Sequence, residues 1–204
     1  MDREQAIKAL DVLRTVVGQA RDDTALQNWG VIWMLHAFTV AGGFIATNVL
    51  LWSGHEEPWP YATMWATIVV FNIATVFALK KRRAGARSFV EGQLWSIWLT
   101  FVAAVSLLAI LNHLMGLRTF YLGPVIGVLA AVSFATMGAL MGRRWYIATA
   151  VFAVASVAMA LAPDHQFIVL GVTWGAAQFT GGAMLHRDRA RRLGGGRDDG
   201  PRLV

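Results

Sequence analysis

The chain of 204 residues contains no cysteine and has few charged side chains. The absence of cysteine excludes disulfide bonds, iron–sulfur ligation and thiolate zinc sites. Charged residues make up only 15% of the chain, whereas soluble domains contain about a quarter. Hydrophobic residues make up 56%. These proportions argue against a soluble protein.

The few charges are also segregated along the chain, and they leave long apolar stretches between them. Within 30–79, 92–142 and 145–185 the charged residues are Glu56, Glu57, Arg118 and Asp164. Apolar stretches of about 20 residues are what a helix needs to cross a hydrocarbon core of roughly 30 Å. We therefore predict an all-α, polytopic membrane protein built on a bundle of six transmembrane helices.

The sequence divides into three parts: an N-terminal segment 1–28, a transmembrane domain 29–185 and a C-terminal tail 186–204. The predicted spans are about 30–52, 61–79, 94–113, 120–141, 145–162 and 167–185. The tail is basic and then rich in glycine, which predicts a disordered cytoplasmic segment.

Apolar residues of the N-terminal segment recur every three or four positions, which predicts an amphipathic helix. They are Ala6, Ala9, Leu10, Leu13, Val16, Val17 and Ala20. Such a helix either lies in the membrane interface, held by its apolar stripe and by anionic lipid headgroups, or packs on the cytoplasmic loops of the protein. At the end of this segment, Thr24 and Gln27 have the spacing of a capping box.

The basic residues predict the orientation of the chain. Seventeen of the eighteen lysines and arginines fall in the N-terminal segment, the second and fourth loops and the tail, and only Arg118 falls on the other side. Because cytoplasmic loops carry the excess of basic residues, both termini are predicted to be cytoplasmic. The Ala-, Gly- and Arg-rich composition suggests a bacterial inner (plasma) membrane. The basic residues flank apolar spans, so no nucleic-acid partner is predicted.

Catalytic signatures are absent from the sequence. It contains no Gly-x-Ser-x-Gly nucleophile motif, no His-Glu-x-x-His motif and no phosphate-binding glycine loop. The span cores also lack Asp, Glu, Lys and Arg, the residues that mark proton relays and ion-coupled transporters. No catalytic residue is therefore predicted, and an enzyme is the least favoured class.

A layer of polar side chains is predicted about 8–11 Å below the inner surface, from a helical rise of 1.5 Å per residue. The candidate ligand-binding residues at this level are His36, Asn72, Glu91 and Gln178, together with Trp174, which lies one helical turn deeper than Gln178. They have two interpretations. They line a cytoplasm-facing pocket with Trp174 as its apolar wall, or they form a clamp of interhelical hydrogen bonds worth roughly 0.6 kcal/mol each.

A second polar group is predicted outside the membrane, where each of three loops carries a histidine. His55, His113 and His165, with the nearby acidic residues, are candidate ligands for zinc or a similar divalent ion. The competing interpretation is that they are interfacial histidines without a common task. A metal site requires their imidazoles to converge to within about 4 Å.

Two functions are therefore favoured over that of an enzyme. The first is a component that binds or transports a small molecule in the cytoplasm-facing pocket. The second is a membrane sensor or assembly subunit whose amphipathic N-terminus and basic tail contact lipid headgroups, a membrane-protein partner or a second copy of the chain. A cavity reaching Trp174 would support the first, and a closed, packed bundle would support the second.

Overall fold

The computed structural model describes residues 7–8, 11–12, 28–79, 89–116 and 121–195, and that part of the chain forms six long helices and no strand. The helices are α2 (Trp29–Trp52), α3 (Pro58–Leu79), α4 (Phe89–Leu114), α5 (Leu122–Met141), α6 (Trp145–Leu161) and α7 (Gln166–Gly195), with a short 3-10 helix η2 (Pro163–His165) before α7. Five of them, all except α6, are long and apolar enough to cross a membrane. The helical fold class is therefore confirmed, with five helices that are long and apolar enough to cross a membrane.

The helix ends follow local chemistry. Helix α2 begins after Asn28, whose backbone lies in the left-handed region at φ 60, which asparagine tolerates better than most residues. The predicted capping box just before it lies outside the described residues. Helix α3 begins at Pro58, where a missing N–H costs nothing because the first turn has no partner for it.

Helix α7 is longer than the sequence predicted. It runs without a break to Gly195, whereas the sequence analysis ended the last span at 185 and expected a disordered tail from His186. A helix that already exists in the membrane extends at little cost, and the arginines, alanine and leucine after His186 are good helix formers. The described part of the helix includes the first two residues of the glycine run, Gly194 and Gly195.

Only 7–8 and 11–12 of the predicted amphipathic N-terminal helix are described, and these four residues are helical. The rest of that helix, and residues 196–204 of the tail, lie outside the described residues.

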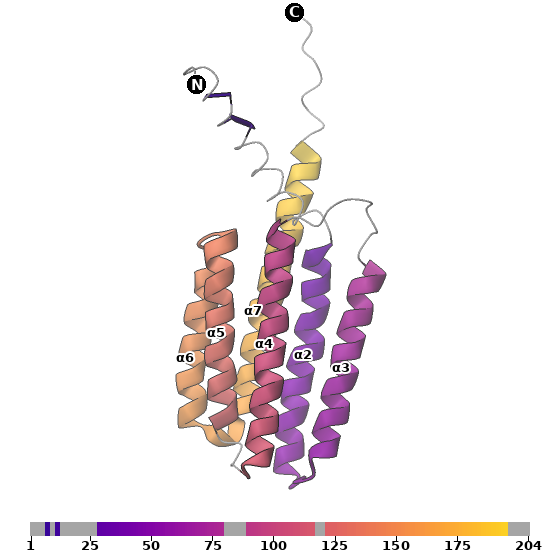
Figure 1. Ribbon diagram of the computed structural model, residues 1–204, viewed down its shortest axis with the longest axis vertical. Helices are drawn as coiled ribbons and strands as arrows, with labels where there is room; N and C mark the ends of the chain where they lie inside the picture. The colour runs from indigo at the N-terminus through magenta and orange to yellow at the C-terminus, as the bar shows by residue number, and fades with distance from the viewer. Residues whose placement is uncertain (1–6, 9–10, 13–27, 80–88, 117–120, 196–204) are drawn as a thin grey trace, which may run out of the picture.

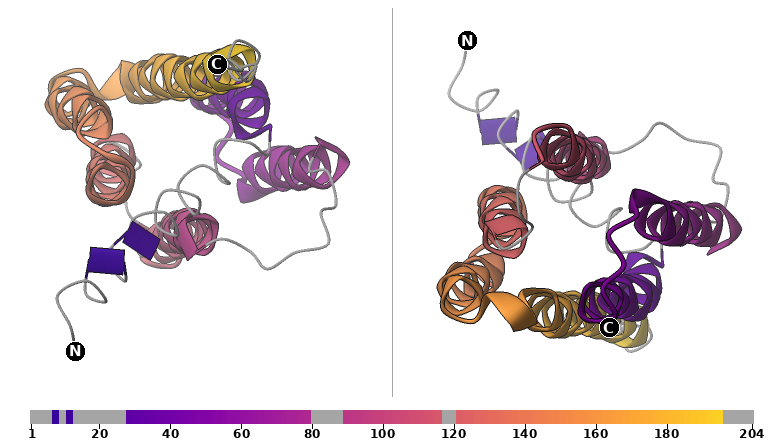
Figure 2. Two further views of the ribbon diagram at one scale, coloured as in Figure 1. Left: turned by 90° about the horizontal axis from the view of Figure 1, so that it is seen from above. Right: turned by 90° about the horizontal axis from the view of Figure 1, so that it is seen from below.

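The helices run up and down in sequence and are arranged in a ring (Figures 1 and 2). Each packs on its chain neighbour except α3 and α4, which do not pack on each other to a comparable extent, and α7 returns to lie against α2 in the most extensive contact of the fold. The pair α5 and α6 comes next. The first and last helices thus close the ring on one side, and α3 and α4 flank its loosest point.

Glycines bring α2 and α7 close together. A Cβ on Gly182 would lie 2.6 Å from the carbonyl oxygen of Gly30, and one on Gly175 would lie 3.1 Å from the Cβ of Ala41. Glycines of α5 face its other neighbour, since Gly127 and Gly138 lie against side chains of α6.

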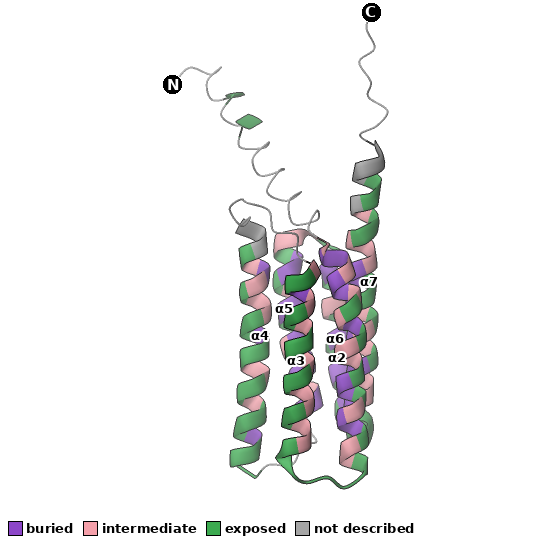
Figure 3. Cartoon of the chain, turned by 90° about the vertical axis from the view of Figure 1, so that its right-hand side faces the viewer, coloured by how far each residue is buried: buried purple, intermediate pink, exposed green. Residues whose placement is uncertain are grey.

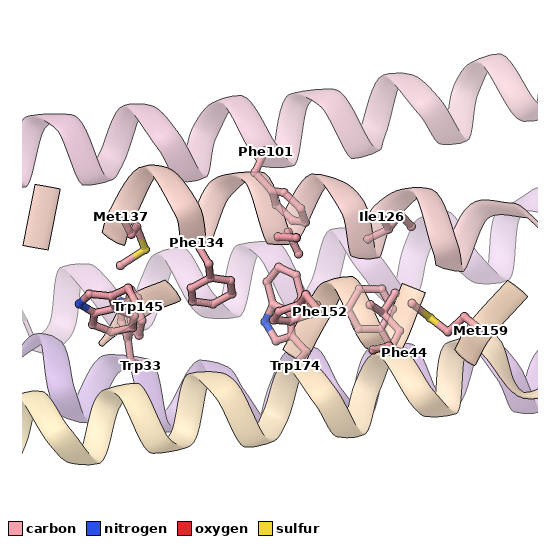
Figure 4. Packing of buried hydrophobic residues seen from close by; sticks show 14 of the residues in the cluster. Trp33, Phe44, Phe101, Ile126, Phe134, Met137, Trp145, Phe152, Met159 and Trp174 are labelled. Atoms are coloured by element: carbon pink, nitrogen blue, oxygen red, sulfur yellow. The ribbon is translucent and has the colours of Figure 1, made fainter. Parts of the chain in front are cut away.

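Buried residues gather on the inner sides of α2, α5, α6 and α7, and α3 is mostly exposed (Figure 3). Aromatic and methionine side chains form a file along the middle of the bundle (Figure 4). Phe134, Phe152 and Met159 in this file have no exposed surface. The centre of the bundle is filled by side chains.

Candidate functional site

Trp174 lies in the middle of the aromatic file and is only 4% exposed. The rings of Phe44, Trp98, Phe101 and Phe152 surround it, with centroids 5.1–5.9 Å from its own (Figure 4). Its indole Nε1 donates a hydrogen bond to Oε1 of Gln178 one turn along α7, at 2.9 Å. Trp174 and Gln178 therefore meet inside the bundle, and the indole N–H of Trp174 has its acceptor there.

His36 and Asn72 form a separate pair between α2 and α3. The imidazole Nε2 of His36 lies 3.2 Å from the backbone carbonyl oxygen of Asn72, and because a carbonyl can only accept, this bond requires the proton on Nε2. Thr39, one turn after His36, donates to Oδ1 of Asn72 at 2.7 Å. No hydrogen bond among the described residues links this pair to Gln178.

The predicted layer is therefore divided into two groups with different partners, one between α2 and α3 and one within α7. Glu91 belongs to α4, but its side chain lies outside the described residues. Thr39 was not singled out from the sequence, although its spacing of three residues from His36 places both on one side of a helix.

Trp98 carries a buried polar atom without a partner. Its Nε1 has no hydrogen-bond acceptor among the described residues. The ring contacts Trp33, Phe134 and Trp174 at centroid distances of 5.4–5.9 Å. A buried donor left unpaired costs roughly 1–3 kcal/mol. The N–H of Trp98 is therefore a group in the aromatic file that lacks a hydrogen-bond acceptor among the described residues.

The three predicted metal ligands are exposed at the opposite end of the bundle from the polar layer. His165 stands edge-on to Trp52 with centroids 5.4 Å apart, and the backbone carbonyl of His55 accepts from the hydroxyl of Tyr61 at 2.8 Å. Within the described part of the chain, no three His, Cys, Asp or Glu residues are grouped so that they could hold a metal ion.

Two buried amides at that end escaped the sequence analysis. Asn48, 1% exposed, accepts from the backbone N–H of Phe167 at 3.2 Å and donates to the carbonyl of Asp164 at 3.1 Å. Gln166 accepts from the backbone N–H of Gly123 at 2.7 Å. Both satisfy N–H groups in the first turn of α7 or α5, which have no partner within their own helix. The sequence could have indicated this role, because Asn48 and Gln166 lie near the ends of predicted spans, where an amide can cap a neighbouring helix.

A partly open cavity of about 180 Å³ lies at the other end, beside the extension of α7. It is lined by Arg144, Met184, Arg187, Asp188 and Arg191, and we call it the arginine cavity. Arg144 Nη1 lies 3.1 Å from Oδ2 of Asp188, which ties the loop before α6 to α7. The sequence analysis used these arginines only as signals of topology.

No family model, curated protein or solved structure matches this chain. Its class follows from the fold and composition: it is an all-helical membrane protein with several helices that can cross the bilayer.

Proposed function

We propose that all six helices cross the membrane, with both termini in the cytoplasm. The helix in question is α6, which has 17 residues and spans about 25 Å at 1.5 Å per residue. A short apolar helix crosses by local thinning of the bilayer at modest cost. Helix α6 packs against α5 and α7, both of which are long enough to cross. The distribution of basic residues supports the same topology.

Within that topology, the protein is a sensor or assembly subunit that presents the basic end of α7 to an anionic partner at the cytoplasmic face. The observation that carries this function is the continuity of α7 to Gly195. Its basic extension is thereby a helical continuation of a membrane helix, and the exposed ion pair between Arg144 and Asp188 connects it to the loop before α6. The filled centre around Trp174 favours this function over a small-molecule pocket.

Native mass spectrometry of the full-length protein, released from membranes in mild detergent, tests the proposal. We expect the protein to retain a second protein subunit or anionic lipid, and to lose it when the C-terminal extension after His186 is removed. Retention of a stoichiometric small molecule by both the full-length and the shortened chain would contradict it.

The unpaired Nε1 of Trp98 supports a second candidate, a small-molecule binding component. The ligand would be an apolar molecule with one hydrogen-bond acceptor, held among the rings of Trp98, Phe101 and Trp174. Trp98→Phe separates the two functions because it removes only the donor and part of the ring. A binding component would lose its ligand in this variant. A packed assembly subunit would keep its partner and be at least as stable, because the variant no longer buries an unpaired N–H.

A further inference from the structure

The arginine cavity combines three guanidinium groups with one carboxylate. Arg187 and Arg191 are four positions apart on α7, so their side chains project from one side of the helix. Both are exposed, and neither has an acidic partner in the part of the chain that the structure describes. Only Arg144 is paired, with Asp188. The cavity therefore carries an excess of two positive charges from its lining residues.

The pairing of Arg144 orients it without using up its hydrogen-bonding capacity. A guanidinium has five N–H donors, and one nitrogen of Arg144 contacts Asp188 at 3.1 Å. Arg144 is also the residue immediately before α6, so the positive end of the dipole of that helix adds to the potential at the cavity. Planar guanidinium groups gathered in this way match the oxygens of a phosphate group.

The place of the cavity in the fold indicates where that phosphate comes from. The apolar run of α7 ends at Leu185, and Arg187 and Asp188 follow shortly after it, which places them at the expected boundary between lipid and water. Met184, one turn toward the membrane, is the apolar member of the lining. The volume of about 180 Å³ exceeds the roughly 30 Å³ share of a single water molecule several-fold. The cavity therefore has room for a phosphate group at the depth of the headgroups.

We propose that the arginine cavity binds the phosphate of an anionic lipid headgroup at the cytoplasmic face of the membrane. This proposal rests on the proposed topology and on the proposed function, in which the basic end of α7 meets an anionic partner. It adds the identity of the anion and the residues that bind it. A soluble phosphate compound offers the same chemistry, and the experiment separates the two sources.

The test measures the thermal stability of the full-length protein in detergent during titration with three probes: phosphatidylglycerol, phosphatidylcholine and inorganic phosphate. We expect phosphatidylglycerol to raise the unfolding midpoint at concentrations where the other two do not. Stabilisation by inorganic phosphate alone would overturn the lipid assignment, and equal stabilisation by phosphatidylcholine would overturn recognition of an anionic headgroup.

Four variants test the residues. Arg187→Gln and Arg191→Gln should each weaken the apparent affinity for phosphatidylglycerol about fivefold, the effect of one basic residue near an anionic surface. Asp188→Asn should strengthen it, because the competing carboxylate is gone. Arg143→Gln is the matched control, since Arg143 is an exposed arginine of the same loop and does not line the cavity.

Arg187→Gln should weaken the affinity for phosphatidylglycerol, whereas Asp188→Asn should strengthen it. A purely structural ion pair would not produce these opposite effects. If the cavity were only a clamp between α7 and the loop before α6, Asp188→Asn and Arg144→Gln would both lower stability, and neither would change the response to lipid. That outcome overturns the proposal. Labelling of single cysteines, described below, tests the topology separately, so an error in orientation is distinguishable from the absence of a lipid site.

Discussion

At the residue scale, His36, Thr39 and Trp174 bond to groups on their own helix or on the adjacent one, whereas the buried Nε1 of Trp98 has no partner among the described residues. His36 and Thr39 both reach Asn72 across the contact of α2 with α3, and Trp174 bonds to Gln178 within α7. Lipid offers no water to an unpaired amide or hydroxyl, so pairing of this kind is the minimum requirement for these residues to lie in a membrane.

The hydroxyl of Thr39 allows this pairing to be measured. Thr39→Val keeps the shape of the side chain and removes its bond to Asn72, so we expect the free energy of unfolding in detergent to fall by about 0.6 kcal/mol, the mean for interhelical hydrogen bonds. Thr75→Val is the matched control, because the hydroxyl of Thr75 bonds only to the carbonyl of Phe71 in its own helix, at 2.9 Å. Equal losses of unfolding free energy in the two variants would show that the hydrogen bond between Thr39 and Asn72 contributes nothing to stability.

The clamp interpretation of His36 is tested in the same way. His36→Ala removes its bond to the carbonyl of Asn72 and should lower the melting temperature modestly while leaving the retained lipid or protein partner unchanged. Loss of a bound small molecule in this variant would restore the predicted pocket as the functional site.

At the element scale, the close approach of α2 and α7 decides the packing. Because a Cβ on Gly182 would lie 2.6 Å from a backbone oxygen of Gly30, relief requires one helix to move. Side-chain adjustment is not sufficient. The hydrophobic effect does not hold helices together in lipid as it does in water. Loss of close backbone packing between α2 and α7 should therefore lower the stability of the protein.

Gly182→Ala should therefore destabilise the protein by roughly 1–3 kcal/mol, the range for overpacked sites. Gly42→Ala provides the comparison in α2, because a Cβ there would meet nothing within 4 Å, and it should be neutral or slightly stabilising. Thermal unfolding of the two variants in one detergent measures the difference.

At the scale of the whole molecule, the topology is tested by labelling. The chain has no cysteine, so Glu57→Cys, Arg143→Cys and Asp164→Cys each provide one thiol at an exposed position. A membrane-impermeant reagent should label Glu57→Cys and Asp164→Cys in intact cells, and Arg143→Cys only after permeabilisation. Because Arg143 and Asp164 lie at opposite ends of α6, labelling of both from one side would show that α6 does not cross.

The sequence by itself determined the helical class and the approximate bounds of the helices, apart from the end of α7, while the orientation stays a prediction. These depend on local quantities, namely the length of apolar stretches and the position of charges, and a bilayer makes both decisive. A spacing of four residues places Trp174 and Gln178 side by side in any helix, although the sequence predicted them as the lining of a pocket and not as a hydrogen-bonded pair.

Only the tertiary structure decided which helices become neighbours. The return of α7 to α2 brings Asn48 to the start of α7, and the approach of α7 to the loop before α6 places Asp188 beside Arg144. His36 and Gln178, which the sequence placed at one depth, were separated for the same reason, since depth along a span does not specify the side of the helix that meets a partner. Contacts between residues more than 40 positions apart depend on how whole helices pack, and no local pattern in the chain encodes that.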